Sequence, residues 1–249
     1  MKKTHVLGAM TLIALTYGAP VLADDVRLHG ATTVVDRLVS PHKAAVEKAT
    51  GHTLTVVGNA TGRGLADLAD GKCDASLSSE PMNIAVEAAK AAGKTVDPGK
   101  LQFAVISNDE IVFVTHKSNP VKKLSWQQIK DIHTGKIANW KEVGGKDMPI
   151  VVFSDSVTGG TRAMVKHVVL EGQEYGANVK AQPSVKKVNE MVAATEAGFG
   201  GLGKGFAETD KVNIVDTKKL ERPLGIVTMG APSPKVEKVI MAFKSAAGK

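Results

Sequence analysis

Three segments of the chain place glycines and small hydroxyl residues just before a pattern typical of a helix. They are residues 30–33 (Gly-Ala-Thr-Thr), 58–64 (Gly-Asn-Ala-Thr-Gly-Arg-Gly) and 158–162 (Thr-Gly-Gly-Thr-Arg). The first backbone N–H groups of a helix lack internal partners, and the aligned peptide dipoles place about half a positive charge there. Glycine lets an oxyanion approach this backbone, and a threonine hydroxyl donates one further hydrogen bond. The pattern therefore favours an anion-binding site.

Arginine could strengthen such a site. Arg162 follows Thr161 directly, in the first turn of its expected helix, where a guanidinium can give one oxyanion two parallel hydrogen bonds. Arg63 is the weaker second candidate. A single segment of this kind is more often a plain turn or helix cap. Three of them, each after an expected strand, favour a shared site, because ligands of open α/β sheets lie at the carboxyl ends of the strands.

The elements that must position these segments follow from hydrophobic periodicity. The predicted strands are residues 26–29, 54–57, 111–115, 150–153 and 226–229. The predicted helices are residues 64–69, 125–133, 162–170, 185–197 and 236–246. This alternation predicts an α/β protein. Pro41 further predicts that the segment after Thr33 breaks at Ser40, where a new helix begins with Ser40 as its cap.

The first 23 residues have the pattern of a cleaved secretory signal peptide. Lys2 and Lys3 precede a short apolar run, and small residues stand before Asp24. We therefore expect residues 1–23 to be removed on export. Loss of these two lysines lowers the formal net charge from +7 to +5. A modest positive field of this size helps to attract small anions.

Composition argues against several other classes of partner. Nucleic-acid binding would require a clustered basic stripe with stacking aromatics, but the lysines are scattered and there are only two Trp, two Tyr and six Phe. We expect no nucleic-acid partner. Cys73 is the only cysteine, which excludes an intramolecular disulfide. We interpret it as a small buried apolar residue.

An enzyme would need an activated nucleophile, a metal cage or two carboxylates with separate roles. The seven histidines have no metal-ligand spacing, and no Gly-x-Ser-x-Gly elbow is present. The stretch Ser154-Asp155-Ser156 is the best candidate for hydrolysis. We interpret Asp155 instead as a residue that orients its loop or pairs with Arg162. We therefore expect no catalytic residue, no metal and no cofactor.

A longer pattern lies between residues 109 and 145. It contains Asp109-Glu110-Ile111-Val112-Phe113-Val114, then Asn119-Pro120-Val121, then Gly135-Lys136-Ile137-Ala138-Asn139-Trp140-Lys141-Glu142-Val143-Gly144-Gly145. Together with Gly160-Thr161-Arg162 and Arg222-Pro223-Leu224, this pattern resembles the phosphate-binding proteins of the high-affinity phosphate ABC importers. The likeness runs through most of the chain after residue 23.

The resemblance implies the two-lobed type II periplasmic binding protein fold, in which two α/β lobes are joined by two crossing strands and enclose the anion. Lobe one would comprise residues 24–107 plus 216–249, and lobe two residues 108–215. The ligand-binding residues carried over from the family are Thr32, Thr33, Thr61, Gly62, Ser78, Ser79, Gly159, Gly160, Thr161 and Arg162.

The chain departs from the family pattern at three places. Ser79 stands where the importer proteins often have an aspartate, Phe153 stands where some relatives have an arginine, and Val157-Thr158 resembles a small insertion. The first departure bears on selectivity, because a carboxylate accepts the O–H of protonated phosphate and repels fully ionised sulfate. The sequence therefore leaves the identity of the anion open.

The expected function is a monomeric periplasmic receptor that binds phosphate or a related oxyanion and delivers it to the membrane subunits of an ABC permease. The alternative is an accessory extracytoplasmic protein of the same fold, for signalling or surface attachment, that binds another anion or none. A periplasmic hydrolase is the less favoured alternative. Stoichiometric anion binding without turnover would favour the receptor.

Overall fold

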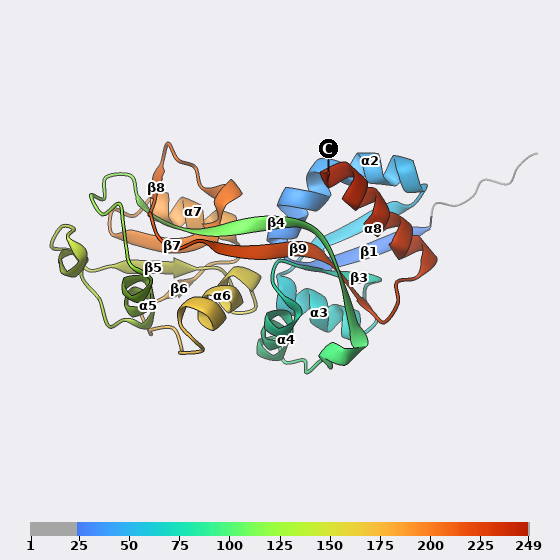
Figure 1. Cartoon of the computed structure of the whole chain (residues 1–249), viewed down its shortest axis with the longest axis horizontal. Helices are drawn as coiled ribbons and strands as arrows, with labels where there is room; N and C mark the ends of the chain where they lie inside the picture. Colours follow the sequence, from blue (N-terminus) through green and yellow to red (C-terminus); the bar gives the residue numbers. More distant parts are fainter. Residues whose placement is uncertain (1–23, 249) are drawn as a thin grey trace, which may run out of the picture.

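Two long antiparallel strands join two α/β lobes (Figure 1). They are β4 (Leu101–His116) and β9 (Leu220–Met229), which pair from Leu101↔Met229 to Ile111↔Leu220. The structure, a computed structural model, describes residues 24–248. The expected signal peptide, residues 1–23, lies outside the described residues. The predicted two-lobed fold with two crossing strands is confirmed.

Lobe one is built around three strands at the carboxyl end of β9. The strands are β1 (Asp25–Gly30), β2 (Thr53–Gly58) and β3 (Ala75–Ser78). The helices are α1 (Thr32–Val34), α2 (Ser40–Thr50), α3 (Thr61–Ala69), α4 (Met82–Ala91) and α8 (Pro234–Ala247). β1 pairs in parallel with β2 and β3, and β3 pairs antiparallel with β9. α2 and α8 cover one face of this sheet, and α3 and α4 cover the other (Figure 1).

Lobe two surrounds the other end of β4. The strands are β5 (Val151–Ser154), β6 (Lys180–Ala181), β7 (Gly198–Gly203) and β8 (Val212–Ile214). The helices are α5 (Trp126–Thr134), α6 (Gly160–Met164) and α7 (Val185–Ala193), with short 3₁₀ turns η3 (Trp140–Val143) and η5 (Lys204–Phe206); a third 3₁₀ turn, η2 (Pro98–Lys100), precedes β4 in lobe one. β5 runs parallel to β6 and β7, and β7 and β8 run antiparallel to β4.

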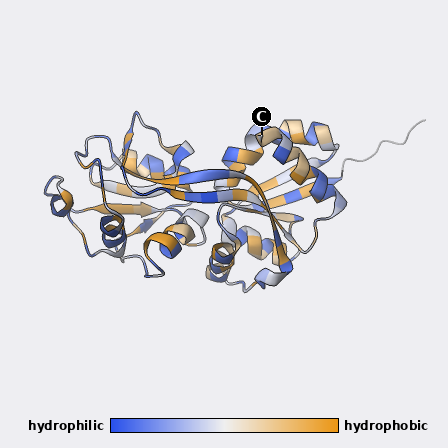
Figure 2. Ribbon diagram, in the orientation of Figure 1, coloured by the Kyte–Doolittle hydropathy of each residue, from blue (hydrophilic) through white to orange (hydrophobic). Residues whose placement is uncertain are grey.

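Each lobe has its own buried core, and one sheet passes through both. The strand order is β2-β1-β3-β9-β4-β7-β5-β6, with β8 paired to β4. Leu28 and Phe243 belong to the core of lobe one, and Phe113 stacks on Phe199 at 5.9 Å in lobe two. Where β4 and β9 cross between the lobes, their residues are hydrophilic (Figure 2). Among residues 24–248, no helix is long and apolar enough to cross a membrane.

The predicted helix break at Ser40 is wrong. α1 continues through a π-helical turn, η1 (Val35–Val39), directly into α2, and Ser40 itself has helical dihedral angles (φ −57°, ψ −43°). The Ser40 N–H bonds to the carbonyl of Val35, five residues earlier. The wider π turn comes directly before Pro41, which has no N–H to donate to the preceding turn. The helix therefore continues past the proline without a break. The helix after Thr161 contains a second π turn, η4 (Val165–Val169).

Candidate functional site

The three glycine and threonine turns meet at one small cavity. They connect β1 to α1, β2 to α3, and β5 to α6. The cavity has a volume of about 10 Å³, which is about the space that one water molecule needs. It is lined by Ala31, Thr32, Thr33, Ala60, Thr61, Ser79, Asp155, Ser156, Gly159, Gly160, Thr161, Pro183 and Ser184. Because residues of both lobes line it, the cavity lies between the lobes.

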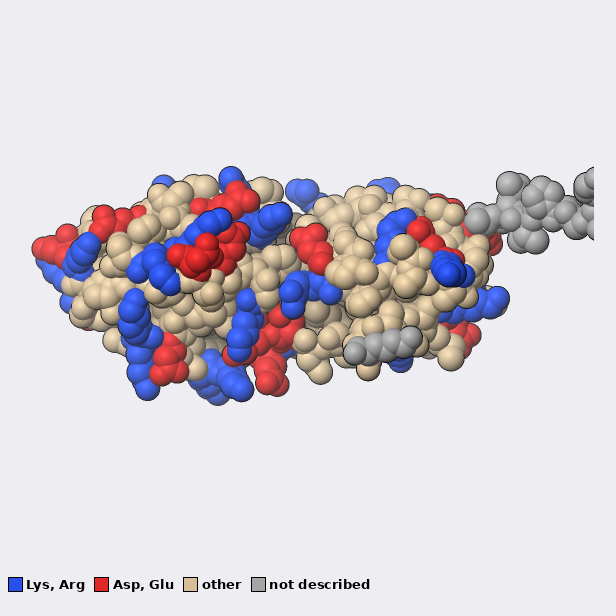
Figure 3. All heavy atoms as spheres, turned by 90° about the horizontal axis from the view of Figure 1, so that it is seen from above, with Lys and Arg blue, Asp and Glu red and all other residues tan. Residues whose placement is uncertain are grey.

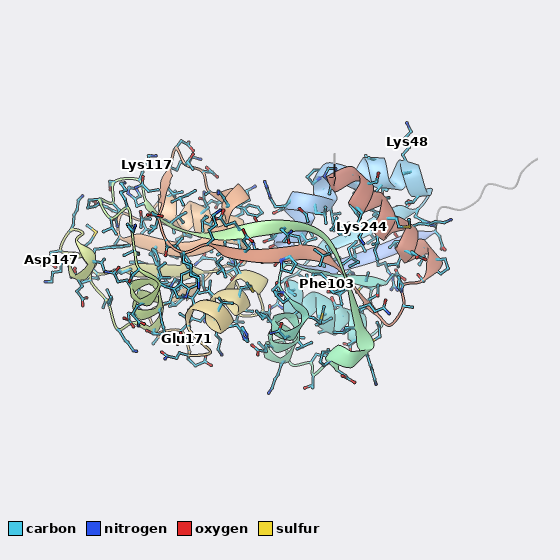
Figure 4. The ribbon with its side chains drawn as sticks, in the orientation of Figure 1. Lys48, Phe103, Lys117, Asp147, Glu171 and Lys244 are labelled. Carbon is cyan, nitrogen blue, oxygen red and sulfur yellow. The ribbon has the colours of Figure 1, made fainter. Side chains whose placement is uncertain are left out.

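The lobes touch each other around this cavity. The Gly62 N–H donates to the Thr158 carbonyl at 3.1 Å, which joins the turn of α3 to the turn of α6. His167 Nδ1 on η4 lies 3.8 Å from Glu87 Oε2 on α4. The side chains at the outer surface, such as Lys48, Lys117 and Asp147, project away from this region (Figure 4). The arrangement is therefore a closed one, with little room left in the cleft.

The helices that follow the three turns have no side-chain caps. α1, α3 and α6 begin after Ala31, Ala60 and Gly159, and none of these residues caps its helix with a side chain. By contrast, Ser125 caps α5 away from the cavity, and Ser184, which lines the cavity, caps α7. Uncapped first-turn amides carry the positive end of the helix dipole toward a ligand.

Ala60 has a backbone conformation that L-residues rarely adopt. Its φ is +75° with ψ 151°, directly before α3. A non-glycine residue in such a region costs of the order of 1–3 kcal/mol, and residues of this kind cluster at ligand sites. With Ala60 in this conformation, α3 begins at the cavity, and its first residue, Thr61, lines it.

Three buried polar atoms near the cavity have no partner at hydrogen-bond distance, Thr61 Oγ1, Glu80 Oε1 and Asp155 Oδ1, although the Thr61 hydroxyl lies close enough to Glu80 to lower the pKa of that carboxyl. Buried polar groups in proteins are normally hydrogen-bonded, because leaving them unpaired is costly. The other Glu80 oxygen, Oε2, accepts from the Ser79 N–H at 3.1 Å and from its hydroxyl at 2.9 Å. Thr61 and Asp155 line the cavity, so their atoms are available to a ligand, whereas Glu80 lies behind the wall.

Burial shifts the protonation of both carboxylates. It raises the pKa of Asp155 to about 7 from 3.8, although the charge of Arg222 opposes the shift. Burial also raises the pKa of Glu80, against the hydrogen bonds of Ser79, the hydroxyl of Thr61 and the charge of Arg222. Both carboxyl groups therefore hold protons more readily than exposed ones, and both respond to the nearby guanidinium.

Arg222 connects the crossing strands to the cavity wall. It lies on β9, is 1% exposed, and donates to Asp109 Oδ2 on β4 from Nη2 at 2.8 Å and from Nε at 3.1 Å. Its Nη1 donates to Thr161 Oγ1 at 2.7 Å. A positive charge is thus held directly behind a cavity-lining hydroxyl.

Comparison with known families identifies the fold family. A family model described as a PBP superfamily domain matches residues 19–245. The chain belongs to the periplasmic binding protein (PBP) superfamily. The phosphate-binding protein PstS of Bacillus subtilis is 37% identical over 92 residues, which is 37% of this chain and 30% of that protein. PstS of Staphylococcus epidermidis is 30% identical over 162 residues, 64% of this chain and 48% of that protein. The matched regions span half or less of these relatives.

A solved structure supports the same assignment. This PBP superposes on a protein from Clostridium perfringens, assigned as a phosphate ABC transporter substrate-binding protein and solved with bound phosphate. The TM-score is 0.76 and the identity 26%, with 88% of this chain and 92% of that chain covered. The predicted resemblance to the phosphate-binding proteins of ABC importers is confirmed.

Most of the residues expected to bind the ligand do meet in this PBP. The structure brings to the cavity Thr32, Thr33, Thr61, Ser79, Gly159, Gly160 and Thr161. Gly62 and Ser78 do not line it. A Cβ at Gly62 would lie 2.1 Å from the Ala88 carbonyl oxygen, so this glycine permits close packing of α3 on α4. Ser78 Oγ donates to the Glu80 carbonyl at 3.0 Å and holds that turn.

Arg162 also lies outside the cavity. Its Nη1 donates to Ser154 Oγ, and its guanidinium lies 3.9 Å from the ring centroid of Tyr175. The Tyr175 hydroxyl donates to the Arg162 carbonyl at 2.9 Å. Arg162 lines a separate cavity of about 260 Å³ between α4 and α6. The contacts with Ser154 and Tyr175 thus hold the guanidinium outside the anion cavity.

Sequence reasoning missed several residues at the cavity. Asp155 was interpreted as orienting its loop or pairing with Arg162; the backbone and charge of Arg162 do act on its carboxyl, and it also lines the cavity, which the sequence did not indicate. Pro183 and Ser184 enter from the start of α7, and Glu80 and Arg222 lie behind the wall. The sequence gave only weak indications of Glu80 and Arg222. Glu80 is the acidic residue next to Ser79, and Arg222 belongs to the Arg222-Pro223-Leu224 motif, to which no role was assigned.

A histidine and a carboxylate also pair away from the cavity. His29 Nδ1 lies 2.8 Å from Asp67 Oδ2, which also accepts from Asn59 Nδ2 at 2.8 Å. Ser76 is the register partner of His29 on β3, but its hydroxyl is fully buried and has no hydrogen-bond partner. A serine nucleophile needs a bond to its base, so this cluster is not arranged for nucleophilic catalysis. Within residues 24–248, no three His, Cys, Asp or Glu side chains are grouped to hold a metal ion.

Proposed function

We propose that this PBP is an extracytoplasmic receptor that captures a small oxyanion, with inorganic phosphate as the first candidate, and delivers it to an ABC permease. The observation that carries the proposal is the convergence of three glycine and threonine turns, from both lobes, on one small cavity. The proposed ligand-binding residues are Thr32, Thr33, Thr61, Ser79, Gly159, Gly160 and Thr161.

Fixed donors replace the water around the ion in this proposal. Threonine hydroxyls and first-turn amides of α1, α3 and α6 surround the ligand, and the positive helix ends act in a water-poor space where electrostatic interactions are stronger. A micromolar receptor needs a binding free energy of only about −8 kcal/mol. Several charge-assisted hydrogen bonds suffice for this after the cost of desolvation.

Closure of the two lobes traps the anion. Residues 24–107 with 216–249 move against residues 108–215, and β4 and β9 serve as the hinge. The proposal is supported by the contacts that hold the lobes together beside the cavity, including the Gly62 to Thr158 hydrogen bond. The closed form is then the one that the permease recognises.

The proposed setting is the periplasm, reached through the leader at residues 1–23, with the protein acting as a monomer and without a cofactor. The names of the relatives support a transport role rather than an enzymatic one. On the face in Figure 3, basic and acidic side chains are interspersed and form no continuous basic stripe. Such a surface suits a receptor for a small anion better than one for nucleic acid.

Calorimetry of residues 24–249 tests the proposal. The protein is freed of phosphate by partial unfolding and refolding, then titrated with phosphate, sulfate and acetate. We expect one phosphate per chain with a Kd of about 1 µM or lower. Thr61→Val and Thr161→Val should each weaken binding, whereas Ser245→Ala, on α8 far from the cavity, should not. Binding of no oxyanion would contradict the proposal and favour the accessory role.

A further inference from the structure

A second cavity lies at the interface between the lobes, outside the anion cavity. It has a volume of about 260 Å³ and lies between α4 of lobe one and α6 of lobe two, which lie side by side below the crossing strands (Figure 1). Lobe one contributes Glu87, Ala88 and Ala91 to its lining, and lobe two contributes six residues between positions 157 and 175. Because both lobes wall it, this α4–α6 cavity has its present form only while the lobes are closed.

Two residues that depart from the family pattern lie at this interface. Val157 and Thr158 resemble a small insertion in the turn before α6. The Thr158 carbonyl accepts the Gly62 N–H of the other lobe at 3.1 Å, and Val157, which is 60% exposed, lines the α4–α6 cavity. The valine side chain is thus available to the apolar part of a ligand. The insertion supplies both a contact between the lobes and an apolar wall of the second cavity.

Arg162 presents a guanidinium with free donors to the α4–α6 cavity. Its Nη1 donates to Ser154 Oγ, and the guanidinium carbon lies 3.9 Å from the ring centroid of Tyr175. Within residues 24–248, Ser154 is the only hydrogen-bond acceptor of this side chain. An arginine carries several N–H donors in a planar fork, so most of them remain available to a ligand. The contacts with Ser154 and Tyr175 also fix the fork in one orientation, which reduces the entropy lost on binding.

The other charged groups around this cavity are paired with one another. Lys166 donates to Glu174, and His167 Nδ1 lies 3.8 Å from Glu87 Oε2 across the interface. The side chains of Glu174 and Glu87 are 81% and 58% exposed, so water screens their charges. Among the residues that the structure describes, Arg162 takes part in no ion pair. Its guanidinium is therefore the group with which an anion in this cavity pairs.

We infer that the α4–α6 cavity is a second ligand site, which binds a small organic carboxylate when the lobes close. The carboxylate group pairs with the fork of Arg162, and the apolar body of the ligand packs against the remaining lining, Ala88, Ala91, Val157 and Ala163. These apolar walls, and a volume far larger than that of the anion cavity, favour an organic anion over a bare oxyanion.

A ligand in this site also acts on closure, because α4 and α6 hold its opposite walls. Occupancy favours the closed form and so raises the affinity for phosphate, and phosphate raises the affinity for the carboxylate by the same factor. This coupling rests on the proposed function, whereas the presence of the carboxylate site does not.

Calorimetry with benzoate at neutral pH tests the site. The protein is first saturated with phosphate, so that the anion cavity is occupied. Benzoate joins a planar carboxylate to an apolar ring, and benzamide has nearly the same shape without the charge. We expect one benzoate per chain with a Kd of about 1 mM or lower, and benzamide to bind at least about tenfold more weakly. Without phosphate, benzoate should bind at least about fivefold more weakly than with it.

Two variants locate the bound benzoate. Ala91→Leu fills the cavity from an exposed position of α4, and Arg162→Lys keeps the charge but loses the planar fork. Each should weaken benzoate binding about tenfold or more. Ala45→Leu, at an exposed position of α2 that does not line the cavity, is the matched control and should leave the benzoate Kd unchanged. Thermal unfolding establishes that each variant is folded.

The outcomes separate this inference from the proposed function. Absence of benzoate binding to the phosphate-saturated protein, or binding that both variants leave unchanged, would overturn the inference and leave the receptor in place. Equal benzoate affinity with and without phosphate would overturn its dependence on closure. If the unchanged protein binds no phosphate, the proposed function fails, but benzoate binding and its loss in Ala91→Leu still decide whether the α4–α6 cavity is a site.

Discussion

Gly160 of lobe two lies against the Glu80 carboxylate of lobe one. A Cβ atom at Gly160 would sit 1.9 Å from Glu80 Oε2 and 2.5 Å from Ser79 Oγ. Glu80 is fully buried and is held by two hydrogen bonds from Ser79. A methyl group at Gly160 would therefore have to displace buried, hydrogen-bonded side chains. The contact between the lobes therefore depends on the absence of a single methyl group.

Gly160→Ala should hinder closure. Overpacking of this kind costs about 1–3 kcal/mol, so we expect the phosphate Kd to rise between roughly fivefold and a hundredfold. Calorimetry measures the affinity, and small-angle X-ray scattering measures whether phosphate still compacts the molecule. Gly99→Ala is the control, because a Cβ there would come no closer than 3.3 Å to the flexible Asp97 side chain. Unchanged affinity and compaction in Gly160→Ala would show that the lobes tolerate the methyl group.

The two arginines near the site should respond differently to substitution. The sequence alone predicts a severe loss of affinity for Arg162→Ala, but Arg162 contacts Ser154 and Tyr175 rather than the cavity. Arg222 donates to Thr161 and Asp109 together, which lysine cannot reproduce. We expect Arg222→Lys to weaken phosphate binding about tenfold or more, and Arg162→Lys to weaken it less than about threefold. The reverse order, measured by calorimetry, would mean that Arg162 turns toward the ligand.

Asp155 should make the ligand-free protein less stable as pH rises. Burial raises its pKa to about 7 in the folded protein, while the unfolded chain ionises near 3.8. Between these values the unfolded state gives up a proton that the folded state keeps, so stability falls across this window and stays low above it. The loss is at most about 4 kcal/mol. Asp155→Asn should remove this dependence, as urea unfolding at about pH 5 and pH 8 would measure. An identical pH dependence in the variant would contradict the assignment.

Cys73 should be chemically inert in the folded protein. It is 4% exposed, and burial with the nearby charge of Asp67 raises the pKa of its thiol to about 12. Since the thiolate is the nucleophile, alkylation by iodoacetamide should be at least about a hundredfold slower in the folded protein than in urea. A variant with Cys73→Ser and Ser245→Cys, which moves the thiol to the exposed surface of α8, should react at the unfolded rate. Rapid labelling of native Cys73 would indicate local opening of lobe one.

Local pattern was enough to place several strands and the three turns. The predicted strands overlap β1, β2, β4, β5 and β9, but residues 111–115 and 226–229 cover only parts of β4 and β9, and β6, β7 and β8 were not predicted. β3 was missed because serines occupy alternate positions of a strand whose four residues are all buried, which interrupts the hydrophobic run. α4 is rich in alanine and gives a weak periodic signal. The π turn before Pro41 has no sequence signature that a proline rule would detect.

The missing parts of the site depend on contacts between distant residues. The orientation of Arg162 is set by Tyr175, thirteen residues later, and Arg222 reaches Thr161 from 61 residues away. Nothing near either arginine in the sequence indicates which one serves the cavity. The three turns, by contrast, could be found because a glycine and threonine pattern before a helix is local chemistry. The sequence pattern alone does not show whether the three turns meet. The resemblance implied that they do, and in the structure residues of all three line one cavity.

Ser79→Asp tests how the chain replaces the acidic residue of its relatives. Ser79 lines the cavity, but its hydroxyl donates to Glu80 Oε2, so an aspartate there would lie against a buried carboxylate. We expect Ser79→Asp alone to weaken phosphate binding about tenfold through repulsion between these like charges. Combined with Glu80→Gln, whose amide can donate to the new aspartate, it should recover phosphate affinity and the preference over sulfate. Calorimetry with both anions measures the two variants. If Ser79→Asp alone improves the phosphate preference, position 79 faces the ligand more directly than Glu80 does, and the proton acceptor belongs there.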